Sequence, residues 1–153
     1  MLALSVALHA LAAIVWVGGM GFAYWYLRPA AGPLDGPVRL GLWQRVFARF
    51  FVWVWISVIV LPVTGYVMVW GQWGGLGSMP LHAHLMQGLG WVMIVIFLYL
   101  WFVPYRRFKA ALAAGDPPTA AAALDRIRLI VKTNLAIGLV NAAIGASGRY
   151  WTL

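Results

Sequence analysis

The chain has 153 residues, of which 64% are hydrophobic and only 9% are charged, and its formal net charge is +8. Soluble domains carry about a quarter charged residues, so this composition excludes an ordinary water-soluble domain and leaves room for one transmembrane domain, residues 1–153. The absence of cysteine excludes disulfides and thiolate chemistry. We expect no nucleic acid partner, because the basic residues lie in short loops between apolar runs.

Four apolar segments predict four membrane-spanning helices, because each crossing of a bilayer needs about 20 apolar residues. In chain order these helices cover about residues 2–27, 50–70, 84–114 and 117–148. The third and fourth extend into water and meet at Gly115-Asp116-Pro117-Pro118, where an aspartate N-cap precedes a proline in the first turn. Residues 36–50 alternate arginine with apolar residues, and we expect them to lie partly along the inner interface. The predicted fold class is an all-α, integral membrane four-helix bundle in contact with the lipid bilayer.

The distribution of basic residues predicts how the bundle is oriented. Ten of the eleven lie in or beside the first and third loops, whereas the second loop, residues 71–83, has no charged residue. The positive-inside rule therefore predicts a multi-pass protein of the bacterial inner membrane, with the N-terminus and the C-terminus both periplasmic. The ten residues are Arg28, Arg39, Arg45, Arg49, Arg106, Arg107, Lys109, Arg126, Arg128 and Lys132.

Small and polar residues recur at helical spacing in the four segments and predict the faces that look inward. In the third segment this stripe contains His84, Gly88, Trp91 and Val95, with Gln87 beside it. The alternative interpretation is that the stripes are only packing seams between helices. The stripe of the first segment is Ser5, His9, Ala12, Trp16, Gly19 and Ala23, and that of the fourth is Asn134, Gly138, Asn141, Gly145 and Gly148.

The three histidines all lie in the outer half of the predicted bundle. His9 lies ~12 Å along the first helix from its outer end, and an ionisable side chain inside a span indicates a functional site. Its structural alternative is a neutral histidine bonded to the fourth helix at Asn141 or Ser147. His82 and His84 are two residues apart and do not share a helix face. We expect His84, which is nearer the membrane, to meet His9, with His82 as the alternative.

Two histidines on facing helices predict haem b, whose iron takes axial imidazoles. In this hypothesis His9 and His84 are the axial ligands, and the indoles of Trp16 and Trp91 wall the ring. Gln87 belongs to the same pocket, and Arg149, the one basic residue at the outer end, would pair with a propionate. Such a haem would transfer single electrons, with a quinol, a porphyrinogen or superoxide as the donor. Whether the protein is an enzyme, a membrane oxidoreductase, stays open at this point.

Copper is the alternative to haem. The run from Met79 to Met86 contains His82 and His84, and combined thioether and imidazole ligands suit Cu(I). A third alternative is a structural subunit without a cofactor, assembling through its glycine faces, for which a dimer is the preferred homo-oligomer. The acidic residues Asp35, Asp116 and Asp125 all lie outside the spans, which argues against a carboxylate-based proton relay or cation channel.

Several motifs resemble the small bacterial CopD-like membrane proteins, named after the copper-resistance D domain. They are LHALAAIVWVGGMGFAYWYLRPA at residues 8–30, LWQRVFARFFVWVW at 42–55, PLHAHLMQGLG at 80–90, FVPYRRF at 102–108 and GASGRYW at 145–151. The chain is also distantly similar to HemJ-type protoporphyrinogen oxidases, which are associated with b-type haem. There, His9 matches the histidine of the first helix, and His84 stands where those proteins have a lysine. That resemblance implies two-histidine haem ligation but leaves the substrate open.

Overall fold

The computed structural model of the chain describes residues 1–151, and the two remaining residues of the predicted domain, 152 and 153, lie outside the described part. Within residues 1–151 all the regular structure is helical. The first stretch contains α1 (Leu2–Ala13), η1 (Ile14–Gly18), α2 (Gly19–Phe22), η2 (Ala23–Leu27) and α3 (Arg28–Ala30). The second is α4 (Gly36–Trp73), followed by the short η3 (Leu76–Ser78). Then come α5 (Leu81–Leu100), η4 (Trp101–Tyr105), α6 (Arg106–Ala113), α7 (Pro117–Ser147) and η5 (Gly148–Tyr150).

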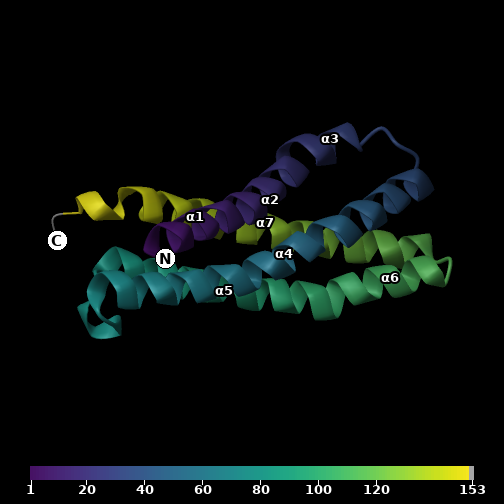
Figure 1. Cartoon of the computed structure of the whole chain (residues 1–153). Coiled ribbons are helices and arrows are strands. Elements are labelled where there is room, and N and C mark those ends of the chain that lie inside the picture. The colour runs from purple at the N-terminus through teal and green to yellow at the C-terminus, as the bar shows by residue number, and fades with distance from the viewer. Residues whose placement is uncertain (152–153) are drawn as a thin grey trace.

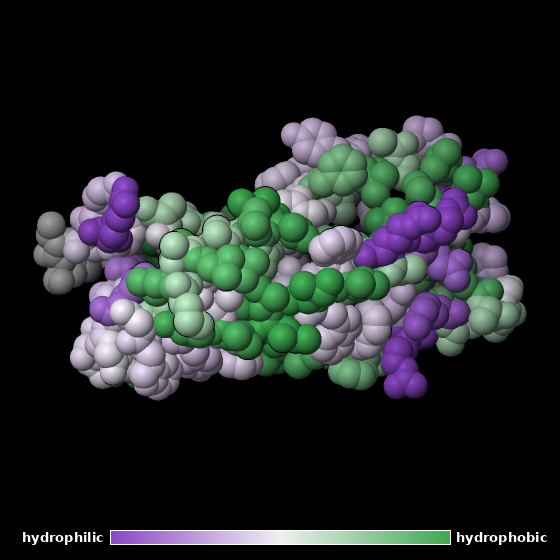
Figure 2. Space-filling view, in the orientation of Figure 1, coloured by the Kyte–Doolittle hydropathy of each residue, from purple (hydrophilic) through white to green (hydrophobic). Residues whose placement is uncertain are grey.

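These elements form four membrane helices packed side by side, each long and apolar enough to span a bilayer. Both termini and the α4–α5 connection lie at one end of the bundle, and the α3–α4 and α6–α7 connections lie at the other (Figure 1). Apolar surface crosses the middle, and hydrophilic side chains gather near the α3–α4 loop (Figure 2). The predicted fold class, an all-α integral membrane four-helix bundle, is therefore confirmed. We call the end with the termini the histidine end and the opposite one the basic end.

The second membrane helix is longer than its sequence-based prediction. It begins at Gly36 rather than near residue 50, so residues 36–50 continue the helix instead of lying along the interface. The reason is their amphipathic spacing, which buries Leu40, Trp43 and Phe47 at 3% to 5% exposure. Of the arginines in this stretch, Arg45 and Arg49 are exposed and Arg39 is half-buried.

The turn between the third and fourth membrane helices forms as predicted. The carboxylate of Asp116 caps α7 by accepting a hydrogen bond from the Thr119 backbone N–H at 3.1 Å. Gly115 precedes it with a φ of 65°, a left-handed conformation that suits glycine. The chain thus reverses direction over residues 114–116 and starts a new helix at once.

An aromatic cluster fills the half of the bundle nearer the basic end. Phe51, at 2% exposure, packs edge-on against Tyr105 with ring centroids 4.8 Å apart and lies 5.8 Å from Phe97. Trp16 meets Phe97 from the first membrane helix at 6.1 Å. Other rings of the cluster are Trp43, Phe47, Trp55, Trp101 and Phe108. Because these large rings interlock, the centre of this half of the bundle is closely packed.

Candidate metal-binding cavity

A cavity of about 630 Å³ lies between the four membrane helices in the half nearer the histidine end. Residues from 6–17, 61–73, 79–94 and 138–146 line it. Its lining includes Trp16 and Met93, at 2% and 3% exposure, which also belong to the hydrophobic core. The cavity volume lies in the range of ligand sites, roughly 300–1,000 Å³. The cavity is therefore the prime candidate for a functional site.

His9 borders the cavity in a fixed orientation. Its Nδ1 lies 2.9 Å from the Oγ1 of Thr64, and the Thr64 hydroxyl lies 2.6 Å from the carbonyl oxygen of Val60. A hydroxyl has a single proton to donate. Since that proton goes to Val60, Thr64 accepts a hydrogen bond from His9 Nδ1–H. With its proton on Nδ1, the neutral imidazole carries its lone pair on Nε2, the nitrogen that would then bind a metal.

This contact also corrects the predicted structural partner of His9. Its partner is Thr64 on α4, and not Asn141 or Ser147 of the fourth helix. The Ser147 hydroxyl instead donates to the carbonyl of Ala143 in its own helix at 2.8 Å. Ser147 is exposed at the end of α7 and does not line the cavity.

Four methionines share the cavity with His9: Met68, Met79, Met86 and Met93. Met79 and Met93 are 6% and 3% exposed. Within the described chain, no three His, Cys, Asp or Glu side chains cluster as a metal site. A metal in this cavity would therefore depend on the thioethers and on one imidazole.

Asn141 adds a polar group to the cavity wall. Its Oδ1 is buried and has no hydrogen-bond partner among the described residues. A buried carbonyl oxygen without a partner costs roughly 1–3 kcal/mol. The cavity therefore holds an unsatisfied acceptor that water or an occupant could satisfy.

The structure brings together some of the predicted site residues and separates the others. Trp16, Gln87 and Trp91 line the cavity with His9, whereas His84 is exposed and does not. The lining therefore offers one imidazole, and it does not fit a haem held by two histidines. Met79 and Met86 of the copper alternative line the same cavity.

His82 and Arg149 lie at the histidine end, outside the cavity lining. The His82 ring is 6.3 Å from the rings of Trp73 and Trp151, and it packs directly against Gly148, where a Cβ atom would collide with it. Arg149 is exposed and hydrogen-bonds the Tyr150 hydroxyl next to it. His82 thus packs against the C-terminal turn, η5, to which Arg149 belongs.

The inward face of α5 is shifted from its predicted stripe by about one residue. Val95 is 62% exposed, while Met93, Ile94 and Phe97 are buried. Large apolar side chains fill a helix seam better than His84 and Gly88 do, and they determine which face turns inward. The fourth-helix stripe was predicted correctly at Gly138, Asn141 and Gly145, which line the cavity.

Sequence reasoning missed Met68, Met93 and the role of Thr64. Met86 and Met93 are seven residues apart on α5, which is about two helical turns and a common face, and Met79 lies just before this helix. Thr64 and Met68 are four residues apart on α4. These spacings were the available signal, but methionine is so frequent in apolar helices that spacing alone does not distinguish ligands from packing.

The fold and the cavity define a multi-pass membrane protein with an imidazole and thioethers facing an internal cavity. A model of the copper resistance protein D (CopD) family matches residues 44–147, more than half of the chain. The chain therefore belongs to the CopD family. The match covers most of α4 and the whole of α5, α6 and α7, and so includes three of the four helices that wall the cavity. No curated protein and no solved structure matches the chain.

Proposed function

We propose that this protein handles copper, binding Cu(I) in the cavity through His9 Nε2 and methionine thioethers. Membership of the copper resistance protein D family supports copper as the metal. The observation that carries the proposal is the gathering of His9 with Met68, Met79, Met86 and Met93 around one cavity. Thioether and imidazole ligands select Cu(I) over harder cations.

The chemistry of the cavity suits a transferable ion. Methionine side chains have three rotatable bonds and adapt to irregular spaces, so different pairs of the four thioethers can complete the coordination of His9. The described lining has no carboxylate, which hard cations such as Mg²⁺ or Ca²⁺ would require. A cavity of about 630 Å³ is larger than a bare ion needs, so the ion can arrive with part of its hydration shell.

The position of the cavity indicates the side from which copper enters. The cavity reaches toward Gln72, Trp73 and Met79 at the histidine end, and the aromatic cluster closes the bundle toward the basic end. Passage of the ion to the basic end would require these rings to move apart. We therefore propose uptake from the histidine end, with binding in the cavity as the first step.

We further propose that the histidine end is periplasmic and that the protein resides in the bacterial inner membrane. The support is the concentration of basic residues at the opposite end. Alkaline phosphatase fused after the C-terminus should be active, whereas the same enzyme inserted in the α6–α7 turn should be inactive. The reverse pattern would contradict this orientation.

The test of copper binding is a titration of the detergent-purified full-length protein with Cu(I), using a competing chromogenic chelator. We expect stoichiometric binding that His9→Ala lowers at least tenfold. His84→Ala is the matched control, because His84 is exposed and does not line the cavity. Equal losses of Cu(I) affinity in the His9→Ala and His84→Ala variants, or no Cu(I) binding by the wild type, would overturn the proposal.

Haem b is the competing occupant, and the same sample distinguishes it. His9 would supply one axial imidazole, and a cavity methionine would have to replace His84 as the second ligand. A visible spectrum before and after dithionite would reveal haem as a Soret band that sharpens on reduction. Protein from haem-replete cells that is colourless but binds copper supports the copper proposal, and a haem spectrum lost in His9→Ala contradicts it.

A further inference from the structure

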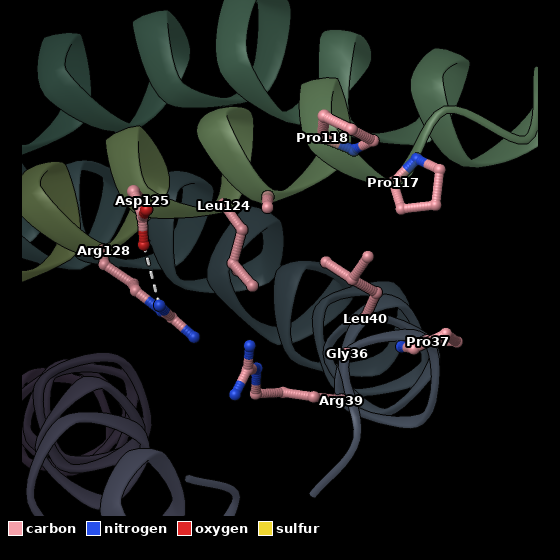
Figure 3. Close-up of a pocket in the computed structure, with 10 residues that line it drawn as sticks. Gly36, Pro37, Arg39, Leu40, Pro117, Pro118, Leu124, Asp125 and Arg128 are labelled. Atoms are coloured by element: carbon pink, nitrogen blue, oxygen red, sulfur yellow. Dashed lines mark hydrogen bonds and ion pairs between the residues drawn. The ribbon is translucent and has the colours of Figure 1, made fainter.

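A second, smaller pocket lies at the basic end, between the first turns of α4 and α7. Its volume is about 290 Å³, and Arg39 and Arg128 both border it. Figure 3 shows the two guanidinium groups extending toward one another from the two helices, with Asp125 beside Arg128. The pocket is separate from the copper cavity, since the two share no lining residue.

The charges in this pocket are not balanced within the described chain. Arg128 Nη1 donates to Asp125 Oδ1 at 2.8 Å, and Arg39 Nη1 donates to the backbone carbonyl of Gly32 at 3.2 Å. Two positive side chains thus face each other across the pocket, and the one carboxylate that lines it, Asp125, lies beside Arg128 and not between the two (Figure 3). Like charges at short range repel, and the repulsion is stronger where the surroundings exclude water.

Arg128 is held in place more firmly than a surface arginine usually is. Its side chain is 24% exposed, and its guanidinium lies 5.9 Å from the ring centre of Trp43, which is buried. Its Nε is buried and has no hydrogen-bond acceptor among the described residues. The guanidinium of Arg128 therefore has N–H donors that Asp125 does not accept.

We propose that this pocket binds a phosphate group between Arg39 and Arg128. A guanidinium presents parallel N–H donors that match two phosphate oxygens, and two such groups offset the charge of a phosphate. Asp125 remains on the outer side of Arg128, and its 70% exposed side chain lets water screen its repulsion of the anion. The phosphate closes the pocket and ties the second membrane helix to the fourth.

Two sources carry this chemistry: the headgroup of an anionic phospholipid and free inorganic phosphate. The pocket lies at the basic end of a membrane bundle, where anionic headgroups collect beside clustered arginines. The copper proposal plays no part in this argument, so either can fail without the other.

The experiment compares the full-length protein in nanodiscs of phosphatidylcholine with and without phosphatidylglycerol. Native mass spectrometry counts retained lipids, and thermal unfolding measures stabilisation by each lipid and by added inorganic phosphate. We expect Arg128→Gln to weaken the binding of the phosphate-bearing ligand about tenfold, as the loss of a charge-assisted hydrogen bond implies. Arg39→Gln should weaken it similarly. Arg126→Gln is the matched control, because Arg126 is exposed on the same helix and bonds Tyr99 instead.

The possible outcomes distinguish a lipid headgroup from free phosphate, and both from failure of the proposal. Retention of phosphatidylglycerol that depends on Arg39 and Arg128 identifies a lipid ligand. Stabilisation by inorganic phosphate in pure phosphatidylcholine, with the same dependence and no lipid preference, identifies a free anion. Equal losses in Arg126→Gln and Arg128→Gln would show a general charge effect and overturn the proposal, as would the absence of any response to either ligand. If Arg128→Gln fails to fold, Arg39→Gln and Arg128→Lys provide the same comparison.

Discussion

The imidazole of His9 and the hydroxyl of Thr64 form a hydrogen bond 2.9 Å long between residues 55 positions apart in the chain. It joins the first membrane helix to the second and orients the one histidine that lines the cavity. Partners of this kind fix the tautomer of a metal-binding histidine, and their loss typically costs 10–100-fold in metal affinity. In the copper proposal, Thr64 is thus a positioning residue, one that would act on the metal through His9.

Removal of the Thr64 hydroxyl should weaken copper binding without removing a ligand. We expect Thr64→Val to lower the Cu(I) affinity roughly tenfold or more and Thr64→Ser to restore it, since serine also carries a hydroxyl. Chelator competition measures both. The control is Thr133→Val, because Thr133 is exposed on α7 and bonds its own helix at Leu129. Similar affinities for the Thr64→Val and Thr133→Val variants would contradict the positioning role.

Substitution of methionines that line the cavity should lower the Cu(I) affinity, whereas substitution of a methionine of the packed core should not. Leucine nearly preserves the volume of methionine and typically costs under about 1.5 kcal/mol of stability, but it removes the sulfur. We expect the double variant Met86→Leu, Met93→Leu to lose Cu(I) affinity while its melting temperature changes little. Met20→Leu is the control, because Met20 is buried at 2% exposure but does not line the cavity. Unchanged affinity in the double variant would exclude these two sulfurs as ligands.

Gly138 allows close contact between the fourth membrane helix and its neighbours. A Cβ atom there would lie 2.9 Å from Val17 Cγ2 and 3.0 Å from Met93 Cε. Valine has few rotamers with which to yield, so Gly138→Ala should destabilise the bundle by about 1–3 kcal/mol. Thermal unfolding in detergent measures this effect. Gly88→Ala, where a Cβ meets nothing within 4 Å, should leave the melting temperature unchanged or raised.

The N-cap at Asp116 should make the stability of the fold depend on pH in the acidic range. The side-chain and backbone hydrogen bonds from Thr119 hold the pKa of Asp116 below its ordinary value. The ionised cap therefore stabilises the fold above that ordinary value, about 3.9, and this stabilisation is lost as pH falls through the lowered pKa. We expect Asp116→Asn, which keeps a capping oxygen but cannot ionise, to remove this part of the acid sensitivity. Melting curves between pH 3 and 6 would show it, and identical pH profiles for wild type and variant would contradict it.

The sequence was sufficient to predict the bundle and its turns, because hydropathy and capping act locally. Four apolar runs and the Asp116 cap are readable without knowledge of the fold. The start of the second helix at Gly36 was missed, since the amphipathic stretch around Trp43 looks the same whether it lies on a membrane surface or against neighbouring helices. Only packing against Phe108 and its neighbours decides between the two.

The site was predictable in part, and the limit was the rotation of α5. His9, Trp16 and Gln87 line one cavity, but a shift of one residue on a helix turns a side chain by about 100°. That shift moves His84 to the exposed surface and brings Met86 and Met93 inward. Rotation of this kind depends on tertiary packing of the whole seam, which local periodicity does not determine.

The lining of the cavity beside His9, as far as the structure describes it, has no carboxylate and no thiolate. A bound Cu(I) would therefore keep its full positive charge inside the bilayer, with only neutral ligands around it. A transmembrane voltage acts directly on such a charge, by about 2.3 kcal/mol for each 100 mV that one elementary charge crosses. The occupancy of the cavity would then depend on the energised state of the membrane as well as on the copper concentration.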